Sequence, residues 1–100
     1  MDVEPELLAR IHAFTNCMNY RIADMLLHTA GAYIGEIADG LGCDENIVYT
    51  HARELSDNGY VRLLHRGRIE PKTRESTYVE PTYALYKMAL TFERMQAEGV

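Results

Sequence analysis

The sequence predicts a mainly α-helical fold with one small β-hairpin, and three observations carry this prediction. Apolar residues recur at helical spacing in five separate segments of the chain. Two short runs, "YVRLLHR" at 60–66 and "STYVE" at 76–80, are predicted as strands and flank a loop that contains Gly67 and Pro71. With 100 residues, 47% of them hydrophobic, the chain 1–100 is long enough for one domain with a real core.

Two amphipathic helices are expected at the start of the chain. Pro5 suits the first turn of a helix over residues 4 to about 15. The apolar face of that helix is formed by Leu7, Leu8, Ile11 and Phe14. A second helix covers about residues 17–29, and the glycine in "AGAY" ends it before a short extended link.

The next two predicted helices are joined by a short turn. The stretch "IGEIADGLG" predicts a short helix closed by Gly42, with an inward face of Ile34, Ile37, Ala38 and Leu41. Asp44 is a good N-cap for a helix that runs to about Asn58 and is terminated by Gly59. Two helices joined by a turn of roughly three to four residues that contains glycine form the helix-turn-helix pattern.

A hairpin and a last helix are expected after Gly59. The strands 60–66 and 76–80 enclose a connection longer than a tight hairpin needs, and such loops usually serve function. Thr82 can cap a helix over about residues 83–98. The apolar side chains of this last helix approach a heptad spacing and are Leu85, Met88, Ala89, Phe92 and Met95.

The predicted helix over residues 45–58 has two different faces. One is an apolar stripe that would pack on the two preceding helices, made of Val48, Ala52 and Leu55 with His51 at its border. The other carries hydrogen-bonding side chains at i, i+3, i+4 and i+7, namely Asn46, Tyr49, Thr50 and Arg53. Because Asn can pair with adenine and Arg with guanine, this stripe indicates a helix that reads a DNA groove. The alternative is an ordinary solvated face, although such faces usually favour Glu and Lys.

The overall charge hides a local concentration of positive charge. A formal net charge of −5 argues against a nucleic-acid partner if the charge is spread evenly. Residues 1–45 carry −6, however, and residues 53–74 carry +3. Basic side chains at a hairpin tip suit phosphate contacts and a narrow minor groove, although the tip can also be a solvated loop. These side chains are Arg66, Arg68, Lys72 and Arg74.

The order "EIADGLGCDENIVYTHARELSDNGYV" resembles the winged helix-turn-helix of the MarR, ArsR and PadR type of bacterial and archaeal transcription regulators. The support helix matches in "EIADGLG", the recognition helix in "VYTHARELSDNGYV", and the wing begins at Val61, within a core of about residues 17–80. The resemblance implies that the helix matching 45–58 enters the major groove, and that the hairpin matching 60–80 touches backbone or minor groove. It implicates Asn46, Tyr49, Thr50 and Arg53 for the groove, and Arg66, Arg68, Lys72 and Arg74 for the wing.

Three features depart from that pattern. Glu45 stands where a basic or hydroxyl residue is common, and it either accepts from a cytosine amino group or complements the helix dipole, the simpler interpretation. The "SxxE" start of the support helix is absent, which predicts a weak N-cap at Tyr33. The cysteine-containing metal motif of metal-sensing ArsR proteins is missing, so we expect neither a metal site nor a cofactor.

Several classes of function are disfavoured by the sequence. We expect no enzyme, because no nucleophile and base pair, metal cluster or phosphate-binding glycine loop is visible. A soluble, cytoplasmic protein is expected, because no apolar stretch approaches the roughly 20 residues of a bilayer span and "MDVEPELLAR" is acidic. Cys17 and Cys43 are expected to be reduced thiols, with a redox pair as the alternative.

The two terminal helices have apolar faces beyond the needs of the core. They can fold onto their own core or pair with a second protomer, and pairing is favoured by the seam of the last helix. Two-fold dimers also suit palindromic operators whose half-sites lie about 34 Å apart. The expected dimer surface consists of Leu7, Leu8, Ile11, Leu85, Met88, Phe92 and Met95.

The sequence thus predicts a homodimeric winged helix-turn-helix protein that binds specific double-stranded DNA and represses transcription by occluding a promoter. The flanking helices, about 4–15 and 83–98, would serve dimerisation, and the identity of any small-molecule effector stays open. The alternative is a winged helix that docks on the transcription machinery through protein contacts. The overall acidity favours this alternative, whereas the basic wing and the polar stripe favour DNA.

Overall fold

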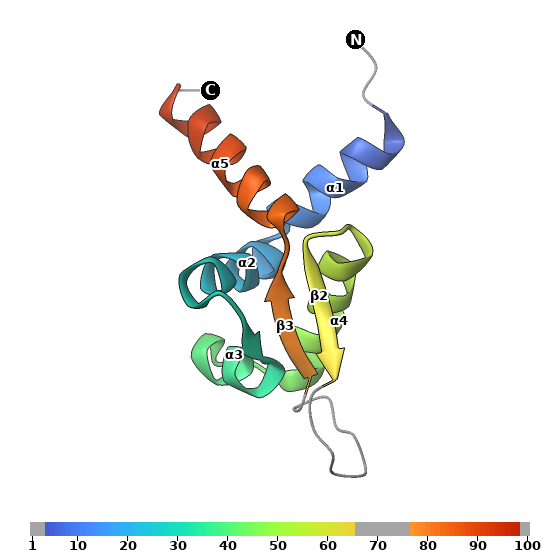
Figure 1. Cartoon of the computed structure of the whole chain (residues 1–100), viewed down its shortest axis with the longest axis vertical. Coiled ribbons are helices and arrows are strands. Elements are labelled where there is room, and N and C mark those ends of the chain that lie inside the picture. Colours follow the sequence, from blue (N-terminus) through green and yellow to red (C-terminus); the bar gives the residue numbers. More distant parts are fainter. Residues whose placement is uncertain (1–3, 66–76, 99–100) are drawn as a thin grey trace.

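The computed structural model describes residues 4–65 and 77–98, which form five helices and three strands (Figure 1). In chain order the elements are α1 (Pro5–Thr15), α2 (Cys17–Thr29), β1 (Ala32–Tyr33), α3 (Ile34–Leu41), α4 (Glu45–Asp57), β2 (Val61–His65), β3 (Thr77–Pro81) and α5 (Tyr83–Ala97). The predicted fold class, mainly α-helical with a small β-hairpin, is confirmed. Within the described ranges, no helix is both long and apolar enough to cross a membrane.

The hairpin pairs with a third, very short strand. β2 and β3 are antiparallel, with Leu63 opposite Val79 and His65 opposite Thr77. β1 adds to the other edge of β3, so the strand order is β1-β3-β2 and β3 is central. The sequence predicts only an extended link at β1, because a strand of 2 residues is too short to show an alternating pattern.

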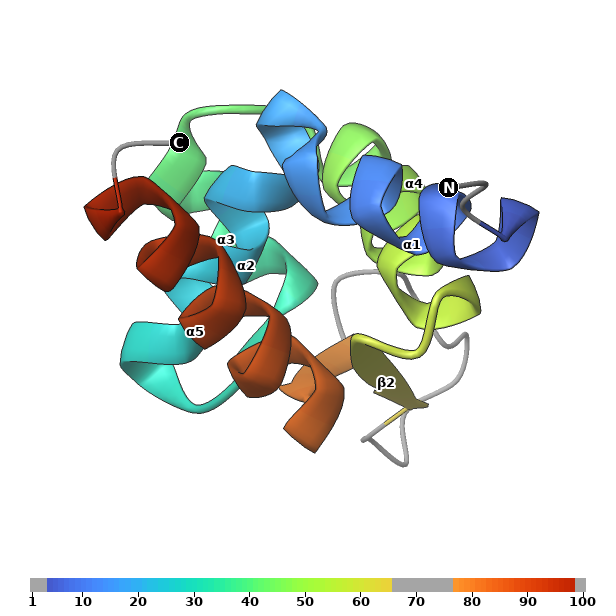
Figure 2. The ribbon, with the colours of Figure 1, turned by 90° about the horizontal axis from the view of Figure 1, so that it is seen from above.

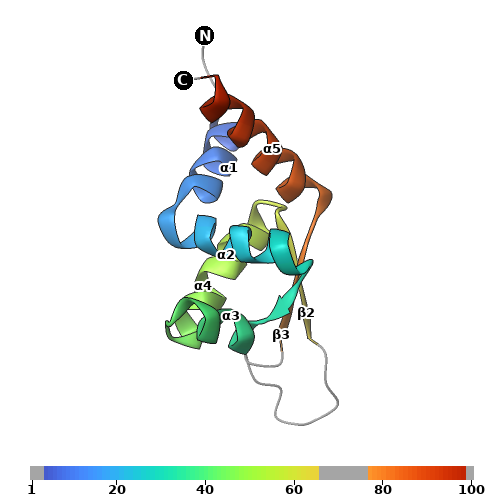
Figure 3. The same cartoon turned by 90° about the vertical axis from the view of Figure 1, so that its left-hand side faces the viewer.

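The core lies where α2, α3 and α4 meet the sheet. Figure 3 shows these three helices on the same side of the strands. Their apolar faces are removed from water, which is the main favourable contribution to folding. The largest apolar side chains with no exposed surface are Ile22, Leu26, Ile34, Ile37, Val48, Leu55, Val79 and Leu85.

Polar side chains and glycine set the helix boundaries. Asp44 caps α4 as predicted, because its carboxylate accepts the N–H of Asn46 at 2.7 Å. Gly42 ends α3 in the left-handed conformation, with a φ of 66°. Asn16 separates α1 from α2, since its side-chain oxygen accepts two first-turn amides of α2 at 3.1 and 3.2 Å.

Two helix starts differ in detail from the prediction. Tyr33 makes no side-chain cap hydrogen bond at the start of α3, as predicted, but the Glu36 carboxylate accepts the N–H of Tyr33 at 3.0 Å, which is half of a capping box. Thr82 does not cap α5 with its side chain. Its hydroxyl donates to the Gly59 carbonyl at 2.6 Å, and its N–H donates to the Tyr60 carbonyl at 3.0 Å. Thr82 therefore ties the start of α5 to the turn between α4 and β2.

α1 and α5 rise from one end of the core and diverge (Figures 1 and 2). α1 is anchored at its middle, where the Tyr60 hydroxyl donates to the Arg10 carbonyl at 2.8 Å. The buried ring of Phe14 also packs against the rings of Tyr60 and Phe92, with centroids 5.8 and 5.7 Å apart. Away from these anchors both helices carry exposed apolar side chains.

One residue of the predicted dimer surface lies in the core of its own protomer. Leu85 is fully buried within its own protomer, so it has no surface left to bury against a partner. Met88 and Phe92 are half-buried, and Phe92 packs on the rings of Phe14 and Tyr20. The members of the predicted surface that are exposed are Leu7, Leu8, Ile11 and Met95.

Tyr60 makes the stability of the fold depend on alkaline pH. Burial raises the pKa of its phenol above the ordinary value of 10.0, and the positive charge of Arg10 opposes part of this rise. The folded chain therefore favours the protonated phenol more than the unfolded chain does. The free energy of unfolding has its full contribution from this group below about pH 10 and falls as the pH rises above that value.

Replacement of Tyr60 by Phe is expected to reduce this alkaline loss of stability. It should also lower the free energy of unfolding at neutral pH by about 1 kcal/mol, because the hydrogen bond to the Arg10 carbonyl is lost. Urea unfolding at a series of pH values measures both effects. Tyr83→Phe is the matched control, since that ring is 80% exposed. Equal alkaline slopes in the two variants would contradict the role of burial.

Candidate nucleic-acid interface

α4 is held with one face in the core and the opposite face outward. The inner face has no exposed surface and consists of Val48, Ala52 and Leu55. Residues spaced three and four apart on the other side of a helix share one face. All four predicted groove residues lie on that outward face: Asn46, Thr50 and Arg53 are exposed, and Tyr49 is half-buried.

The members of this stripe differ in the groups that they present. Arg53 forms no ion pair with any described residue, so its guanidinium can approach a base edge or a phosphate. Thr50 donates its hydroxyl proton to the Asn46 carbonyl at 2.9 Å, which leaves the hydroxyl oxygen as an acceptor. Tyr49 packs partly against the core, so its ring contributes less outward surface than the helical pattern predicts.

The two acidic residues at the start of α4, Asp44 and Glu45, lie where they stabilise helix N-termini. Asp44 is the N-cap of α4. Glu45 is half-buried, and its Oε1 lies 3.9 Å from the position that a Cβ would take at Gly35, in the first turn of α3. A carboxylate near helix N-termini is stabilised by the helix dipole. This position supports the interpretation of Glu45 as a helix-end residue, separate from the outward stripe of Asn46, Tyr49, Thr50 and Arg53.

The β2–β3 hairpin extends toward the end of the molecule where α4 begins, so β2 ends there and β3 starts there (Figure 1). The last pair of the hairpin joins His65 and Thr77, whose Nδ1 and Oγ1 atoms lie 3.2 Å apart. The four predicted wing residues, Arg66, Arg68, Lys72 and Arg74, lie outside the described residues. Their contact with DNA therefore stays a prediction.

A buried polar contact joins α4 to the helices behind it. Asn19 of α2 has no exposed surface, and its Nδ2 donates to the Ala13 carbonyl of α1 at 2.9 Å. Its Oδ1 lies 2.7 Å from Nδ1 of His51 in α4. Because an amide oxygen can only accept, the Nδ1 of His51 carries a proton in this contact. Three helices thus meet at one side-chain amide.

Helical periodicity alone does not identify Asn19 as a positioning residue. Its position one turn before Ile22 and Ala23 places it on the apolar face of α2. A buried amide needs internal hydrogen-bond partners, so an Asn on an apolar face indicates a specific polar contact. The sequence places His51 at the border of the apolar stripe, and the structure supplies its partner.

Alanine variants of Asn19 and His51 are expected to be coupled. Each single variant leaves a partly or fully buried polar group without its partner, which should lower the free energy of unfolding by about 1–3 kcal/mol. The double variant should lose about 1 kcal/mol less than the sum, as measured by urea unfolding.

The pair His51→Ala and Asn58→Ala is the control for this cycle. The Asn58 side chain bonds to the Glu54 carbonyl, not to His51, so these two losses are expected to add. If the losses at Asn19 and His51 are also additive, the contact between them does not couple α2 to α4.

The arrangement of these elements defines the class of fold. α3 and α4 form a helix-turn-helix, the β2–β3 hairpin follows directly, and β1 pairs with the central strand. This is a winged helix-turn-helix with one additional helix at each end.

Solved structures of transcription regulators share this fold. The transcriptional regulator homologue from Pyrococcus horikoshii OT3 matches with a TM-score of 0.72 at 24% identity, covering 96% of this chain and 97% of that chain. The AntR antimony-specific transcriptional repressor matches with a TM-score of 0.72 at 15% identity, covering 94% of this chain and 79% of that chain. An ArsR family transcriptional regulator matches with a TM-score of 0.65 at 16% identity, covering 93% of each chain.

These likenesses confirm the predicted resemblance at the level of the fold. No protein-family model and no curated protein sequence matches the chain. The part of the chain that the structure describes contains no group of three or more His, Cys, Asp or Glu side chains placed to hold a metal ion. Both cysteines are free, with Cys17 exposed and Cys43 half-buried.

Proposed function

We propose that this chain is a transcription regulator that binds double-stranded DNA as a homodimer and represses by occluding a promoter. In this proposal α4 enters the major groove, and the β2–β3 hairpin lies along the backbone or the minor groove. The observation that carries it is the outward stripe of α4, where Asn46, Thr50 and Arg53 are exposed while the opposite face is fixed in the core. Matching structures of the same fold include a regulator and a repressor of transcription, which supports this function.

The outward stripe has the chemistry of major-groove recognition. A guanidinium such as that of Arg53 can donate two hydrogen bonds to O6 and N7 of guanine, and the amide of Asn46 can pair with N6 and N7 of adenine. Tyr49 and Thr50 lie beside them and suit contacts to bases or phosphates. Since the core and the Asn19 contact already fix α4, binding would order few additional groups.

Attraction to DNA is expected from the segment after α4 more than from α4 itself. α4 carries Arg53 against Glu45, Glu54 and Asp57. The net charge of +3 over residues 53–74 arises entirely beyond the helix, because residues 53–57 carry −1 and residues 58–74 carry +4. We therefore assign the phosphate contacts mainly to Arg66, Arg68, Lys72 and Arg74.

Exposed apolar side chains favour pairing through α1 and α5. Seven of the nine large hydrophobic side chains exposed in the described chain lie on these two helices, away from the start of α4 (Figure 1). They are Leu7, Leu8, Ile11, Tyr83, Tyr86, Leu90 and Met95. Tyr83, Tyr86 and Leu90 are additions to the surface predicted from the sequence. A two-fold contact through these helices would leave α4 uncovered in both protomers, which suits a palindromic site.

Binding to duplex DNA is expected to depend strongly on salt. A dimer that neutralises about eight phosphates should give a slope near −7 when the logarithm of the association constant is plotted against that of salt concentration. On duplexes selected from a random pool, Arg53→Ala should weaken binding by about 1–3 kcal/mol and relax the preference at one base position. The double variant Arg66→Ala, Arg68→Ala should weaken binding to all sequences and reduce the salt slope.

Arg21→Ala is the matched control for these variants, because it removes the same charge from an exposed position on α2, outside the proposed DNA and dimer surfaces. DNA affinity should be unchanged in this variant. Absence of binding at low salt in a folded protein would refute the proposal and favour a winged helix that docks on other proteins. Loss of affinity that is equal for Arg53→Ala and Arg21→Ala would refute the role of α4.

Charged substitutions on the terminal helices are expected to separate the dimer. Leu7 is 46% exposed and Leu90 is 51% exposed in the protomer, and pairing would bury both positions. Leu7→Glu and Leu90→Glu each place a carboxylate at such a position, where its burial is unfavourable. Light scattering should then report the mass of one chain. Ile47→Glu is the control, since Ile47 on α4 is also 46% exposed and lies outside the proposed contact. A single-chain mass for the unsubstituted protein at high concentration would contradict the dimer.

A further inference from the structure

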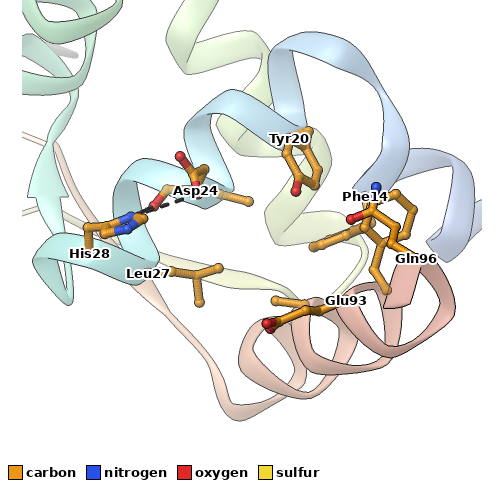
Figure 4. A pocket seen from close by; sticks show the side chains of 10 residues that line it. Phe14, Tyr20, Asp24, Leu27, His28, Glu93 and Gln96 are labelled. Atoms are coloured by element: carbon orange, nitrogen blue, oxygen red, sulfur yellow. Dashed lines mark hydrogen bonds and ion pairs between the residues drawn. The ribbon is translucent and has the colours of Figure 1, made fainter. Parts of the chain in front are cut away.

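A cavity of about 270 Å³ lies between α2 and α5 (Figure 4). Its apolar wall is formed by the rings of Phe14, Tyr20 and Phe92, whose centroids are 5.6 or 5.7 Å apart in every pair. Phe14 is 2% exposed and closes the inner side, whereas Tyr20 is 39% exposed and is accessible from solvent. The cavity is therefore a partly enclosed, aromatic site that opens at the surface.

The polar side chains around this cavity include two carboxylates, one from each helix. Asp24 and His28 come from α2, and Glu93 and Gln96 come from α5 (Figure 4). The Nδ1 of His28 donates to the Asp24 main-chain carbonyl at 2.7 Å and lies 3.8 Å from Asp24 Oδ1. Glu93 forms no ion pair with a described residue.

Positive side chains are absent from the described lining. No lysine or arginine is among the residues that line the cavity. Arg21 lines the neighbouring hollow beside Tyr20, but its guanidinium donates to the Leu41 carbonyl of α3 at 3.5 Å. The two carboxylates of the cavity thus lack a cationic partner among the residues that line it, apart from the imidazole of His28.

This lining distinguishes between classes of ligand. An anion would be repelled by Asp24 and Glu93. A metal ion is disfavoured, because these carboxylates and His28 do not form a group that could hold one among the described residues. A cation would gain from both carboxylates and from the negative faces of the aromatic rings.

We propose that this cavity binds a small organic cation with a flat apolar body, such as an aromatic amine or an aromatic quaternary ammonium compound. Its volume is near the lower end of small-molecule sites, roughly 300 Å³, which suits a single ring with a short substituent. The cationic head lies between Asp24 and Glu93, and the apolar body packs against Tyr20 and Phe92.

A ligand at this position would contact both α2 and α5, which have different proposed roles. α2 carries Asn19, which bonds to His51 of α4, and α5 carries much of the proposed dimer surface. The ligand changes DNA affinity only if its own affinity differs between two arrangements of these helices, the one that binds DNA and the one that does not. That regulatory consequence rests on the proposed function, whereas binding of the cation does not.

Calorimetric titration of the full chain without DNA tests the site with three probes that share one ring. Benzyltrimethylammonium is expected to bind at least about fivefold more tightly than benzyl alcohol, because only the cation gains from the rings and the carboxylates. Benzoate is expected to show no binding. Asp24→Asn and Glu93→Gln should each weaken binding of the cation by roughly fivefold and leave benzyl alcohol unaffected.

Glu98→Gln is the matched control, since it removes one negative charge just after α5 and outside the cavity. It should leave binding of the cation unchanged. The proposal is overturned by a cation that does not bind, by benzoate that binds as well as the cation, or by cavity variants that behave like Glu98→Gln. A chain that binds DNA but not the cation refutes this inference alone, and a chain that binds the cation but not DNA refutes only the proposed function.

Discussion

The orientation of α4 depends on the burial of its inner face, and the proposed DNA surface depends on that orientation. Val48, Ala52 and Leu55 have no exposed surface. Their burial contributes about 25 cal/mol per Å² of apolar area, or several kcal/mol for the three together. A rotation of α4 by one residue, about 100°, would expose these side chains and turn polar stripe residues toward the core. The outward stripe is therefore a consequence of apolar packing, so its side chains can be selected for binding and not for stability.

Directional hydrogen bonds supplement this packing where helices distant in sequence meet. The Asn19 amide reaches His51 across 32 residues of sequence, and the Tyr60 hydroxyl reaches the Arg10 carbonyl across 50 residues. Both contacts involve α1, directly or through the Ala13 carbonyl. Buried polar networks of this kind specify one arrangement because a displaced partner leaves a buried polar group unsatisfied. The helix proposed for dimerisation is consequently bonded to the same amide as the helix proposed for DNA.

Sequence patterns predicted the elements whose signals are local. The cap at Asp44, the stop at Gly42 and the two faces of α4 follow from a few neighbouring residues, and the structure has all three. Features decided by tertiary contacts could not be predicted this way. Thr82 has a capping residue type, but the chain turn brings the Gly59 carbonyl within 2.6 Å of its hydroxyl. Leu85 fits the helical seam, but β3 leads α5 directly onto the core, where that side chain is buried.

The same distinction applies to the two candidate sites. The groove stripe lies on one helix and is visible from spacing alone. The α2–α5 cavity is not visible from sequence spacing. Tyr20 and Asp24 come together with Phe92 and Glu93 only when the last helix folds back beside the second. β1 is a similar case, since two residues become a strand only because β3 offers them an edge. Prediction of the fold and the sites from the sequence is therefore limited mainly by contacts between residues distant in sequence, and less by local conformation.

An overall charge of −5 is compatible with a DNA surface because the charges are separated and partly used by the fold. Glu36 and Asp44 accept main-chain amides at helix starts, where the helix dipole offsets part of their charge. Screening at physiological salt has a length of about 8 Å, so a DNA backbone near the hairpin would sense the +3 of residues 53–74 more than carboxylates on α5. By the same screening, Asp24 and Glu93 act mainly within their own cavity. A domain of this size can therefore present a surface for a polyanion at one end and a site for a cation between two helices at the other.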